Sequence, residues 1–525
     1  MDTHFHALVL GTGITESIAA AALSKAGLKV VHVDVNHYYG ANEASLTSEE
    51  LLKWIETIST DTDSLSEASA SVFGELSHSP RSYSLSLSPS VIVSTGPLIS
   101  SLIGSGVSRY GGFNLLGNIS VYSAAGFKSV PGSKEEIFKS KELSLMDKRR
   151  LMRFLTFAGG DFENSPEIQG RENMHFLRFL VDVFSLERRL ASALAYALAL
   201  CISDTELVIP ALTRLKRYLR AAGRYGPSPF LVGQYGGMGE LAQGFCRVAA
   251  VSGGTYILGH DIFSIDMISN EAKSAVIHRL KLDSLPRDLT ADIIISSPDI
   301  LLKYKKSSTD KFDECSTVGL QACCILVVDG SITSIQKFDS TERTIDEAHT
   351  ENSLGHSRSI DSALLVFPPG ELPSGTAQGP VHVLLNGEGT LSCPRGRSIL
   401  YFSTALDTNA PYDIKTNPEI LIRPYITATL SMICTAEFVS PKELFSGFYL
   451  KSQHSFSASF QESLKEYGIV VCSSPPAHFA ERGDAAAVNA EGIYREVLKR
   501  LGRAGSGSET ELWPPLPMEP DDADP

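Results

Sequence analysis

The segment ALVLGTGITESIAAAALSKAGLKVVHVD, residues 7–34, constrains the fold more than any other part of the chain. Two apolar runs, 7–10 and 28–33, predict buried strands, and the small apolar residues between them predict a helix. Gly11 and Gly13 permit the tight turn from the first strand into that helix. A strand–turn–helix–strand unit of this kind predicts an α/β fold with the dinucleotide-binding architecture.

This turn departs from the dinucleotide-binding fingerprint G-x-G-x-x-G, because Glu16 stands where the third glycine is expected. That glycine lets helix and strand approach closely, and a glutamate there adds bulk and negative charge where a pyrophosphate would bind. Glu16 could also simply complement the helix dipole. Asp34 follows the turn by about 20 residues, where an acidic residue would bind a ribose hydroxyl. We therefore predict the architecture without bound FAD or NAD, and no cofactor.

The composition favours two or more domains and no nucleic-acid partner. The chain has 525 residues and a formal net charge of −14, and this charge opposes non-specific binding to nucleic acid. Asp2 and His4 precede the first predicted strand, so no secretory signal is expected, and the longest apolar run, 190–202, is too short to span a membrane. The eight cysteines form no C-x-x-C pair, which indicates a reducing compartment and no metal framework.

Changes of composition along the chain predict its domains. Residues 1–130 and 224–502 carry the strand patterns and are predicted to form one discontinuous domain with mixed sheets. The helical spacing of apolar residues over 131–223 predicts an inserted all-helical second domain. The Ser-rich stretch 57–90 predicts a disordered insertion, and the Gly, Ser, Pro and acidic residues of 503–525 predict a flexible acidic tail.

The chain lacks the common catalytic motifs. The histidines form no H-E-x-x-H pair, and neither a G-x-S-x-G elbow nor a G-x-x-x-x-G-K-[ST] loop is present. No residue is therefore nominated as a nucleophile, a general base or a metal ligand.

Two blocks of the sequence resemble one known family. The first is LGTGITESIAAAALSKAGLKVVHVDVNHYYGANEASLT, residues 10–47, and the second is YGPSPFLVGQYGGMGELAQGFCRVAAVSGGTYIL, residues 225–258. The T-E after G-T-G-x, the YYG after the aspartate and the GELAQGF segment are similar to the pattern of the Rab escort protein and Rab GDP-dissociation inhibitor superfamily. The resemblance extends to about residue 260, and it departs from the family at Ala41, where a second glycine is usual.

This resemblance implies a fold related to FAD-containing monooxygenases, kept as a scaffold, with a helical second domain and no catalytic residue, cofactor or metal. It implies binding of GDP-bound Rab GTPases, unprenylated and prenylated, and their presentation to the alpha/beta heterodimer of Rab geranylgeranyltransferase. The geranylgeranyl lipid would then be shielded by the apolar helices expected at 173–201 and 211–222. The implied localisation is cytoplasmic, with transient membrane association.

The resemblance also places a Rab-binding surface on six residues. An arginine in such a surface offers bidentate hydrogen bonds, and a tyrosine offers a rigid amphipathic contact. Two of the six have an alternative role, because Tyr39 could simply pack after its strand and Ile257 could belong to the core. The six residues are Tyr39, Glu240, Gln243, Arg247, Thr255 and Ile257.

A further pair separates two branches of the family. In EEIFKSKELSLMDKRRLMRFL, residues 135–155, Phe138 precedes Arg149 by eleven residues, a spacing that the resemblance links to prenyltransferase binding in escort proteins. Phe138 could instead be an ordinary core aromatic, and Arg149 a solvated residue on a helix face. The resemblance favours an escort protein. The alternatives are an inhibitor that extracts and recycles prenylated Rabs, and a flavin-dependent oxidoreductase on the same fold.

Overall fold

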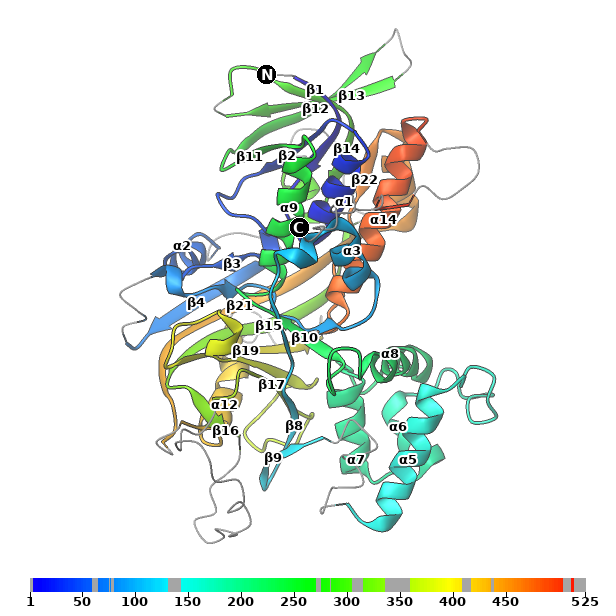
Figure 1. The fold of residues 1–525 in the computed structure, drawn as a ribbon, viewed down its shortest axis with the longest axis vertical. Coiled ribbons are helices and arrows are strands. Elements are labelled where there is room, and N and C mark those ends of the chain that lie inside the picture. The colour runs from blue at the N-terminus through cyan, green and yellow to red at the C-terminus, as the bar shows by residue number, and fades with distance from the viewer. Residues whose placement is uncertain are drawn as a thin grey trace, which may run out of the picture.

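The computed structural model describes most of the chain as two large sheets and a group of helices. Figure 1 shows the sheet of β1 and β2 at one end, the sheet of β15 and β19 below it, and helices α5 to α8 beside the second sheet. The described residues are 3–58, 65–74, 76, 80–130, 143–270, 275–283, 285–304, 315–335, 359–407, 417–435, 439–503 and 511–513.

The first sheet has seven strands and contains the predicted strand–turn–helix–strand unit. Its order is β11–β2–β1–β14–β13–β12, with β22 beside β14. Its centre is parallel because β1 pairs in parallel with both β2 and β14, whereas β12 and β13 run antiparallel. The strands are β1 (His4–Leu10), β2 (Val30–Asp34), β11 (Thr255–Leu258), β12 (Ile262–Asn270), β13 (Ala275–Leu282), β14 (Leu289–Ser296) and β22 (Ile469–Val471).

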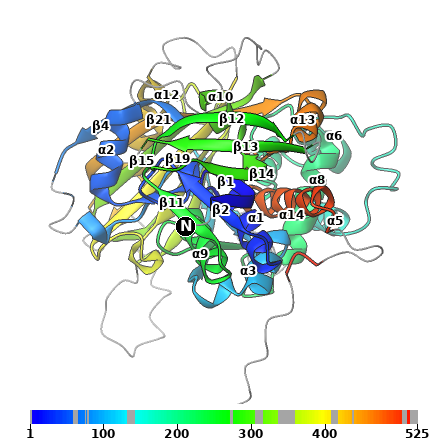
Figure 2. The same cartoon turned by 90° about the horizontal axis from the view of Figure 1, so that it is seen from above.

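Helices cover one face of β1 and β2. The strands β12 and β13, at the end of the same sheet, lie on the opposite side of β1 and β2 from these helices (Figure 2). Helix α1 packs closely because Ala19, Ala20, Ala21 and Ala22 are all buried and offer little bulk. The helices on this side are α1 (Ile14–Lys25), α3 (Pro97–Ser105), α9 (Met238–Val251) and α14 (Arg482–Arg500).

The second sheet has eight strands in the order β4–β21–β15–β19–β18–β17–β8–β9. It is mixed, because β17 pairs in parallel with β8 while the other pairs are antiparallel. The strands are β4 (Leu65–Val72), β8 (Asn118–Ser123), β9 (Gly126–Ser129), β15 (Cys315–Asp329), β17 (Ser362–Phe367), β18 (Val381–Asn386), β19 (Arg397–Leu406) and β21 (Lys442–Phe456).

Strand β4 overturns one prediction. It lies inside the Ser-rich stretch 57–90, which we expected to be disordered, and it pairs with β21 at the edge of the second sheet. Leu65 and Ala68 are buried while the strand's serines, Ser66, Ser69 and Ser71, are not, so two apolar side chains suffice to hold this polar strand. Further along, Tyr83, Leu85 and Leu87 are also buried. The low apolar content concealed a strand that needs only one covered face.

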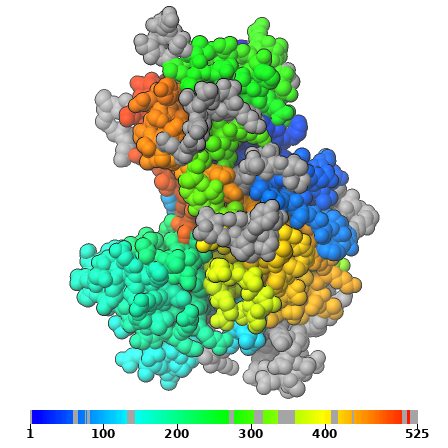
Figure 3. Space-filling model, turned by 180° about the vertical axis from the view of Figure 1, so that it is seen from behind, coloured from blue at the N-terminus to red at the C-terminus, as the bar shows by residue number. Residues whose placement is uncertain are grey.

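The helices between β9 and β10 form their own group, seen as a cyan and green lobe beside the second sheet (Figure 3). Aromatic side chains fill its interior: the rings of Phe154 and Phe184 lie 5.2 Å apart, and those of Phe179 and Phe184 lie 5.7 Å apart. The elements are α5 (Leu145–Gly159), α6 (Phe176–Phe184), α7 (Arg188–Ala193), the π-helix η4 (Leu194–Leu198) and α8 (Val208–Ala221).

Charged contacts join this helical group to α14. The Arg217 guanidinium and the Tyr218 hydroxyl of α8 both donate hydrogen bonds to the Glu481 carboxylate, next to the start of α14. Arg217 also lies 3.6 Å from Asp484, which in turn accepts a hydrogen bond from the backbone N–H of Leu98 at the start of α3. The helical group is therefore tied to the helices that cover the first sheet.

A short part of the C-terminal stretch departs from the prediction, while residues 504–510 and 514–525 lie outside the described residues. Within 503–525, expected to be a flexible tail, residues 511–513 are described, and the Trp513 ring stacks on Phe245 of α9 with centroids 6.0 Å apart. Here a tryptophan offers enough apolar surface to dock a segment whose neighbours are Gly, Ser, Pro and acidic residues.

The remaining described elements are short connections and edge pieces. None of the described helices has the length and apolar character required to cross a bilayer. These elements are η1 (Ala41–Glu43), β3 (Ser45–Leu46), α2 (Ser48–Ile58), η2 (Pro80–Ser82), β5 (Leu85–Ser86), β6 (Ile92–Val93), η3 (Val107–Arg109), β7 (Phe113–Leu115), β10 (Phe230–Gly233), α10 (Pro298–Tyr304), β16 (Ile332–Ser334), η5 (Glu388–Thr390), α12 (Pro418–Leu430), β20 (Cys434–Thr435) and α13 (Ala458–Glu466).

Candidate functional site: a closed nucleotide pocket beside an exposed helix

The carboxylate of Asp34, at the end of β2, is fully used inside the protein. One oxygen accepts hydrogen bonds from the backbone N–H of Thr12 at 2.8 Å and from its hydroxyl at 2.6 Å. The other accepts from the backbone N–H of Asn36 at 2.9 Å and from its side-chain amide at 3.0 Å. Asp34 is also buried. The residue that would bind a ribose thus serves to fix the Gly11–Gly13 turn.

Two glutamates crowd the other side of the turn. A Cβ atom placed on Gly13 would lie 2.6 Å from a carboxylate oxygen of Glu16 and 3.0 Å from one of Glu43. The backbone N–H of Ile14, in the first turn of α1, points to the Glu43 carboxylate at 3.4 Å. Because such N–H groups are the ones that bind phosphate, protein carboxyl groups lie where a pyrophosphate would approach.

The charge state of Glu16 differs from the one assumed for a helix cap. Its burial, together with the nearby Glu43 carboxylate, raises the pKa of Glu16 to about 8. This pKa favours the protonated form of Glu16 at neutral pH, and a protonated carboxyl has no negative charge with which to complement the helix dipole. Its bulk, rather than its charge, closes the turn.

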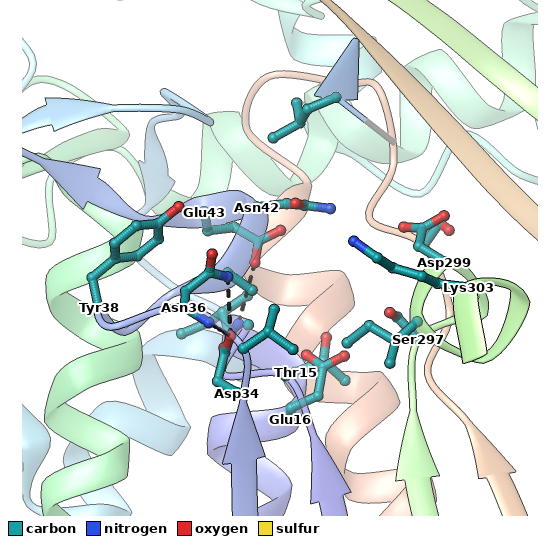
Figure 4. A pocket seen from close by; sticks show the side chains of 18 of the residues that line it. Thr15, Glu16, Asp34, Asn36, Tyr38, Asn42, Glu43, Ser297, Asp299 and Lys303 are labelled. Atoms are coloured by element: carbon teal, nitrogen blue, oxygen red, sulfur yellow. Dashed lines mark hydrogen bonds between the residues drawn. The ribbon is translucent and has the colours of Figure 1, made fainter. Parts of the chain in front are cut away.

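These groups line a pocket between the turn, the start of α10 and the loop after β22 (Figure 4). Asp299 and Lys303 face the turn from the α10 side, across from Glu43 and Asn42. The cavity has a volume of about 280 Å³, at the lower limit for sites that hold small molecules, roughly 300–1,000 Å³. With Asp34 engaged and Ile14 facing a carboxylate, the residues of the pocket do not fit a dinucleotide such as FAD.

An exposed row of polar side chains lies on α9, close to this pocket. Glu240, Gln243 and Arg247 are three and four positions apart, so they fall on one side of the helix. Gln243 and Arg247 are exposed and Glu240 is half-buried. The opposite side of α9 is apolar and packs on α1 through residues such as Leu241 and Phe245. The periodicity of α9 therefore presents three of the six predicted Rab-binding residues to solvent.

Arg247 has a partner that the sequence did not indicate. Its guanidinium lies 4.6 Å from the centre of the Tyr110 ring, which follows the short helix η3. Tyr110 is itself 57% exposed, so the pair forms part of the surface. A cation–π contact of this kind holds the guanidinium in one orientation while leaving its N–H groups available.

Tyr39 joins the same surface from the loop after β2. Its ring lies edge-on to Tyr256 of β11 with centroids 5.9 Å apart. The adjoining Gly40 closely approaches the start of α9, because a Cβ on Gly40 would lie 3.3 Å from the Cα of Gly239. Tyr39, α9 and β11, which are far apart in the sequence, are therefore neighbours.

Strand β11 contributes differently from what we predicted. Thr255 is half-buried, but Ile257 is only 8% exposed and packs in the core with Val31 and Val33. Ile257 therefore presents no side-chain surface to a partner. Tyr256, which was not predicted, supports Tyr39 instead. The alternation of the T-Y-I-L segment could have placed Tyr256 on the opposite side of the strand from Ile257.

Of the two residues predicted to contact a prenyltransferase, the structure describes only Arg149. Arg149 is exposed on α5, in the helical group, at the far end of the molecule from β11 (Figure 1). Phe138 lies outside the described residues. Within the described part of the chain, no group of three or more His, Cys, Asp or Glu side chains could hold a metal ion.

Comparison with known proteins finds relatives of similar sequence. The chain is 31% identical over 402 residues to the "Rab proteins geranylgeranyltransferase component A" of Saccharomyces cerevisiae, covering 76% of this chain and 61% of that protein. It is 31% identical over 319 residues to the Drosophila melanogaster protein of the same name, covering 57% and 60%. It is 32% identical over 270 residues to the "Probable secretory pathway GDP dissociation inhibitor 1" of Schizosaccharomyces pombe, covering 50% and 58%. The chain thus spans about three-fifths of the length of these relatives.

Solved structures share the fold. A Rab GDI from Plasmodium falciparum has a TM-score of 0.63 at 19% identity, covering 95% of this chain and 99% of that one. An oxidoreductase from Methanosarcina mazei has a TM-score of 0.56 at 14% identity, covering 93% and 100%. The predicted FAD/NAD(P)-binding-like fold is confirmed. Residues 1–348 match the family described as GDP dissociation inhibitor, and so the chain belongs to the GDP dissociation inhibitor family.

Proposed function

We propose that the chain is a Rab escort protein without chemistry of its own. It binds newly made, GDP-bound Rab GTPases, presents them to Rab geranylgeranyltransferase and delivers the prenylated product to membranes. The observation that carries this proposal is the surface of Tyr39, Glu240, Gln243 and Arg247, half-buried at the first two residues and exposed at the last two, beside a pocket lined by the protein's own carboxyl groups. The relatives named as component A of the transferase support the escort branch.

The surface on α9 is chemically suited to a folded protein partner. It combines a guanidinium held by Tyr110 with the carboxyl of Glu240 and the amide of Gln243, so it can both donate and accept hydrogen bonds. Tyr39 adds an aromatic contact on a rigid support. Thr255 completes the proposed surface, whereas the buried Ile257 supports it from below.

The lipid explains why a carrier is needed. A geranylgeranyl group has about twenty carbons, which at ~0.8 kcal/mol per buried carbon gives an upper bound of roughly 16 kcal/mol for membrane attachment. The helical segments 173–201 and 211–222 remain our proposed shield for it. Their apolar side chains, such as Phe176, Phe179 and Leu212, are buried against each other, so a bound lipid chain would have to separate these helices.

A prenylation assay tests the proposal directly. Purified transferase, geranylgeranyl diphosphate and an unmodified Rab are combined with and without this protein, and lipid transfer to the Rab is measured. We expect transfer only when the protein is present. Transfer that is equal in both reactions would contradict the escort function, even if the protein binds the Rab.

The inhibitor alternative is favoured by one relative, the GDP dissociation inhibitor of Schizosaccharomyces pombe. The variants Phe138→Ala and Arg149→Ala separate the two functions, because we propose that both residues contact the transferase. In an escort protein, Phe138→Ala abolishes transferase binding and prenylation but leaves Rab binding intact. If the wild-type protein never binds the transferase yet extracts prenylated Rab from membranes, the inhibitor function is correct.

The flavin oxidoreductase alternative has a simple test as well. Since Glu16, Glu43 and Asp34 close the pocket, we expect no stoichiometric flavin in the purified protein. Absorbance of the supernatant after denaturation measures released flavin. A ratio near one flavin per chain would reinstate that alternative.

A further inference from the structure

The docked segment Glu511–Trp513 lies against the helices that carry the proposed Rab-binding surface. The Trp513 ring stacks on the Phe245 ring of α9, with centroids 6.0 Å apart and planes inclined by 24°. The Lys25 ammonium at the end of α1 lies 5.9 Å from the centre of the indole. Trp513 thus contacts both α1 and α9 at one point.

Helix α3 is shaped to accept this ring. A Cβ atom on Gly104 would lie 2.9 Å from the indole and 3.0 Å from the Trp513 Cβ, so a larger residue at 104 would displace the tryptophan. Leu512 packs at the edge of the same core cluster, which contains Leu102 of α3 and Phe245 of α9. The contact is therefore a fitted seat made by three helices rather than a chance encounter of a tail.

This seat lies behind the exposed row of α9. Phe245 lies between Gln243 and Arg247 in sequence, on the opposite side of the helix, where it is completely buried. We propose that Trp513 is a positioning residue for the proposed Rab-binding surface: it presses α9 against α1 and α3 from behind and so holds Gln243 and Arg247 in their binding arrangement. This inference rests on the proposed function only where it concerns Rab affinity.

The indole N–H is buried but has no acceptor among the described residues, so stacking and the Lys25 contact hold the ring without a hydrogen bond. Residues 511–513 themselves form no helix or strand. The stack on Phe245 and the contact with Lys25 are therefore the interactions through which Trp513 acts on α9 and α1.

The chain offers a direct optical test because it contains two tryptophans, Trp54 and Trp513. Trp54 is buried against Tyr449, so Trp54→Phe leaves Trp513 as the single tryptophan reporter. Acrylamide quenching of that variant measures whether Trp513 is docked. Hydrogen exchange of the α9 amides, without any partner, then compares wild type with Trp513→Ala and Trp513→Phe. The control is Tyr467→Ala, which removes an aromatic side chain that is 50% exposed and distant in sequence from these helices.

We expect Trp513 to be poorly quenched, Trp513→Ala to speed exchange in α1, α3 and α9 alone, and Trp513→Phe to restore much of the protection. Rab affinity of Trp513→Ala should fall by about two- to tenfold, the equivalent of one lost aromatic pair. Quenching equal to that of the denatured chain overturns the proposal, and so does faster exchange spread over the whole protein. If wild type binds no Rab while Trp513→Ala still changes α9 exchange, the proposed function fails and the positioning role of Trp513 stands.

Discussion

The pocket beside the Gly11–Gly13 turn and the exposed row on α9 lie on two sides of the same strand–turn–helix–strand unit. Their polar groups differ, because those of the pocket are hydrogen-bonded within the protein and those of the row are exposed to solvent. In the pocket, both carboxylate oxygens of Asp34 accept hydrogen bonds from Thr12 and Asn36. On α9, Gln243 and Arg247 remain exposed. The difference teaches that one scaffold can satisfy the polar groups of a pocket internally while it leaves other polar groups at the surface, where a partner could reach them.

The comparison predicts different consequences of mutation. A group that is buried and fully hydrogen-bonded matters for stability, because its loss leaves donors without acceptors. A group that is exposed matters for binding, because water replaces the lost contact in the free protein. Changes in the pocket should therefore lower the free energy of unfolding, whereas changes on α9 should lower affinity.

The largest effect is expected for Asp34→Ala. It leaves the Thr12 N–H, the Thr12 hydroxyl and the Asn36 N–H without their buried acceptor. We expect the free energy of unfolding to fall by about 3–5 kcal/mol, from several charge-assisted hydrogen bonds lost together. Chemical denaturation measures it, with Asp34→Asn as the milder control that keeps one acceptor oxygen. An unchanged denaturation midpoint would mean that the pocket is not held from within.

The next effect depends on pH and concerns Glu16→Gln. Because burial and Glu43 raise the pKa of Glu16 to about 8, its neutral form is retained in the folded protein while the unfolded chain, with the usual pKa of 4.5, is already ionised. Stability from Glu16 is thus fully present below the unfolded pKa and is lost as pH rises through about 8. Between about pH 6 and about pH 8, the free energy of unfolding of the wild type should therefore fall by on the order of 2 kcal/mol more than that of Glu16→Gln.

The measurement is urea denaturation of both proteins across this pH range. Parallel curves would contradict a protonated Glu16, and would restore the view that its negative charge complements α1. The control is Glu163→Gln, which removes a surface carboxylate paired with Lys216. In this variant the free energy of unfolding should change with pH as it does in the wild type.

The binding side of the comparison is tested by Arg247→Ala. We expect Rab affinity to fall by about 1–3 kcal/mol, as for truncation of a charge-assisted contact in an interface. Since Arg247 is exposed, the melting temperature should stay the same. Calorimetric titration against GDP-bound Rab measures the affinity, and Arg178→Ala on α6, a 75% exposed side chain, is the matched control. A lowered melting temperature with unchanged affinity would mean that Arg247 contributes to stability rather than to Rab binding.

The sequence predicted the first sheet well because its signal is local. The glycine turn, the alanine-rich helix and the two flanking apolar runs follow each other within residues 7–34, and each is a short-range preference. The sequence did not indicate strand β4 or the docking of Trp513, for the opposite reason. Each is held by partners hundreds of residues away, namely β21 and Phe245, and its own neighbours in sequence are polar. Composition cannot reveal such partners.

The candidate site shows the same division. The resemblance proposed Tyr39 and the row on α9, which remain predictions, whereas burial decided between the two roles left open for Ile257, because only the structure shows β11 paired with β2. Glu43 and Tyr110 were missed altogether. Nothing in the sequence marks Glu43 as a neighbour of Glu16 or Tyr110 as a neighbour of Arg247, since the first contact joins η1 to the turn before α1 and the second joins the residue after η3 to α9.

The smallest effect is expected for Tyr110→Leu, which sharpens the comparison within the exposed surface itself. If Tyr110 only covers apolar surface, a leucine replaces it at no cost to binding. If its ring holds the Arg247 guanidinium in place, as the distance of 4.6 Å indicates, its loss frees the arginine and costs about 0.5–1 kcal/mol of Rab affinity, the range of an exposed cation–π contact. Tyr110→Phe keeps the ring and should bind like wild type. The decisive measurement is a double-mutant cycle with Arg247→Ala: coupling between the two positions supports orientation by the ring, and strictly additive losses contradict it.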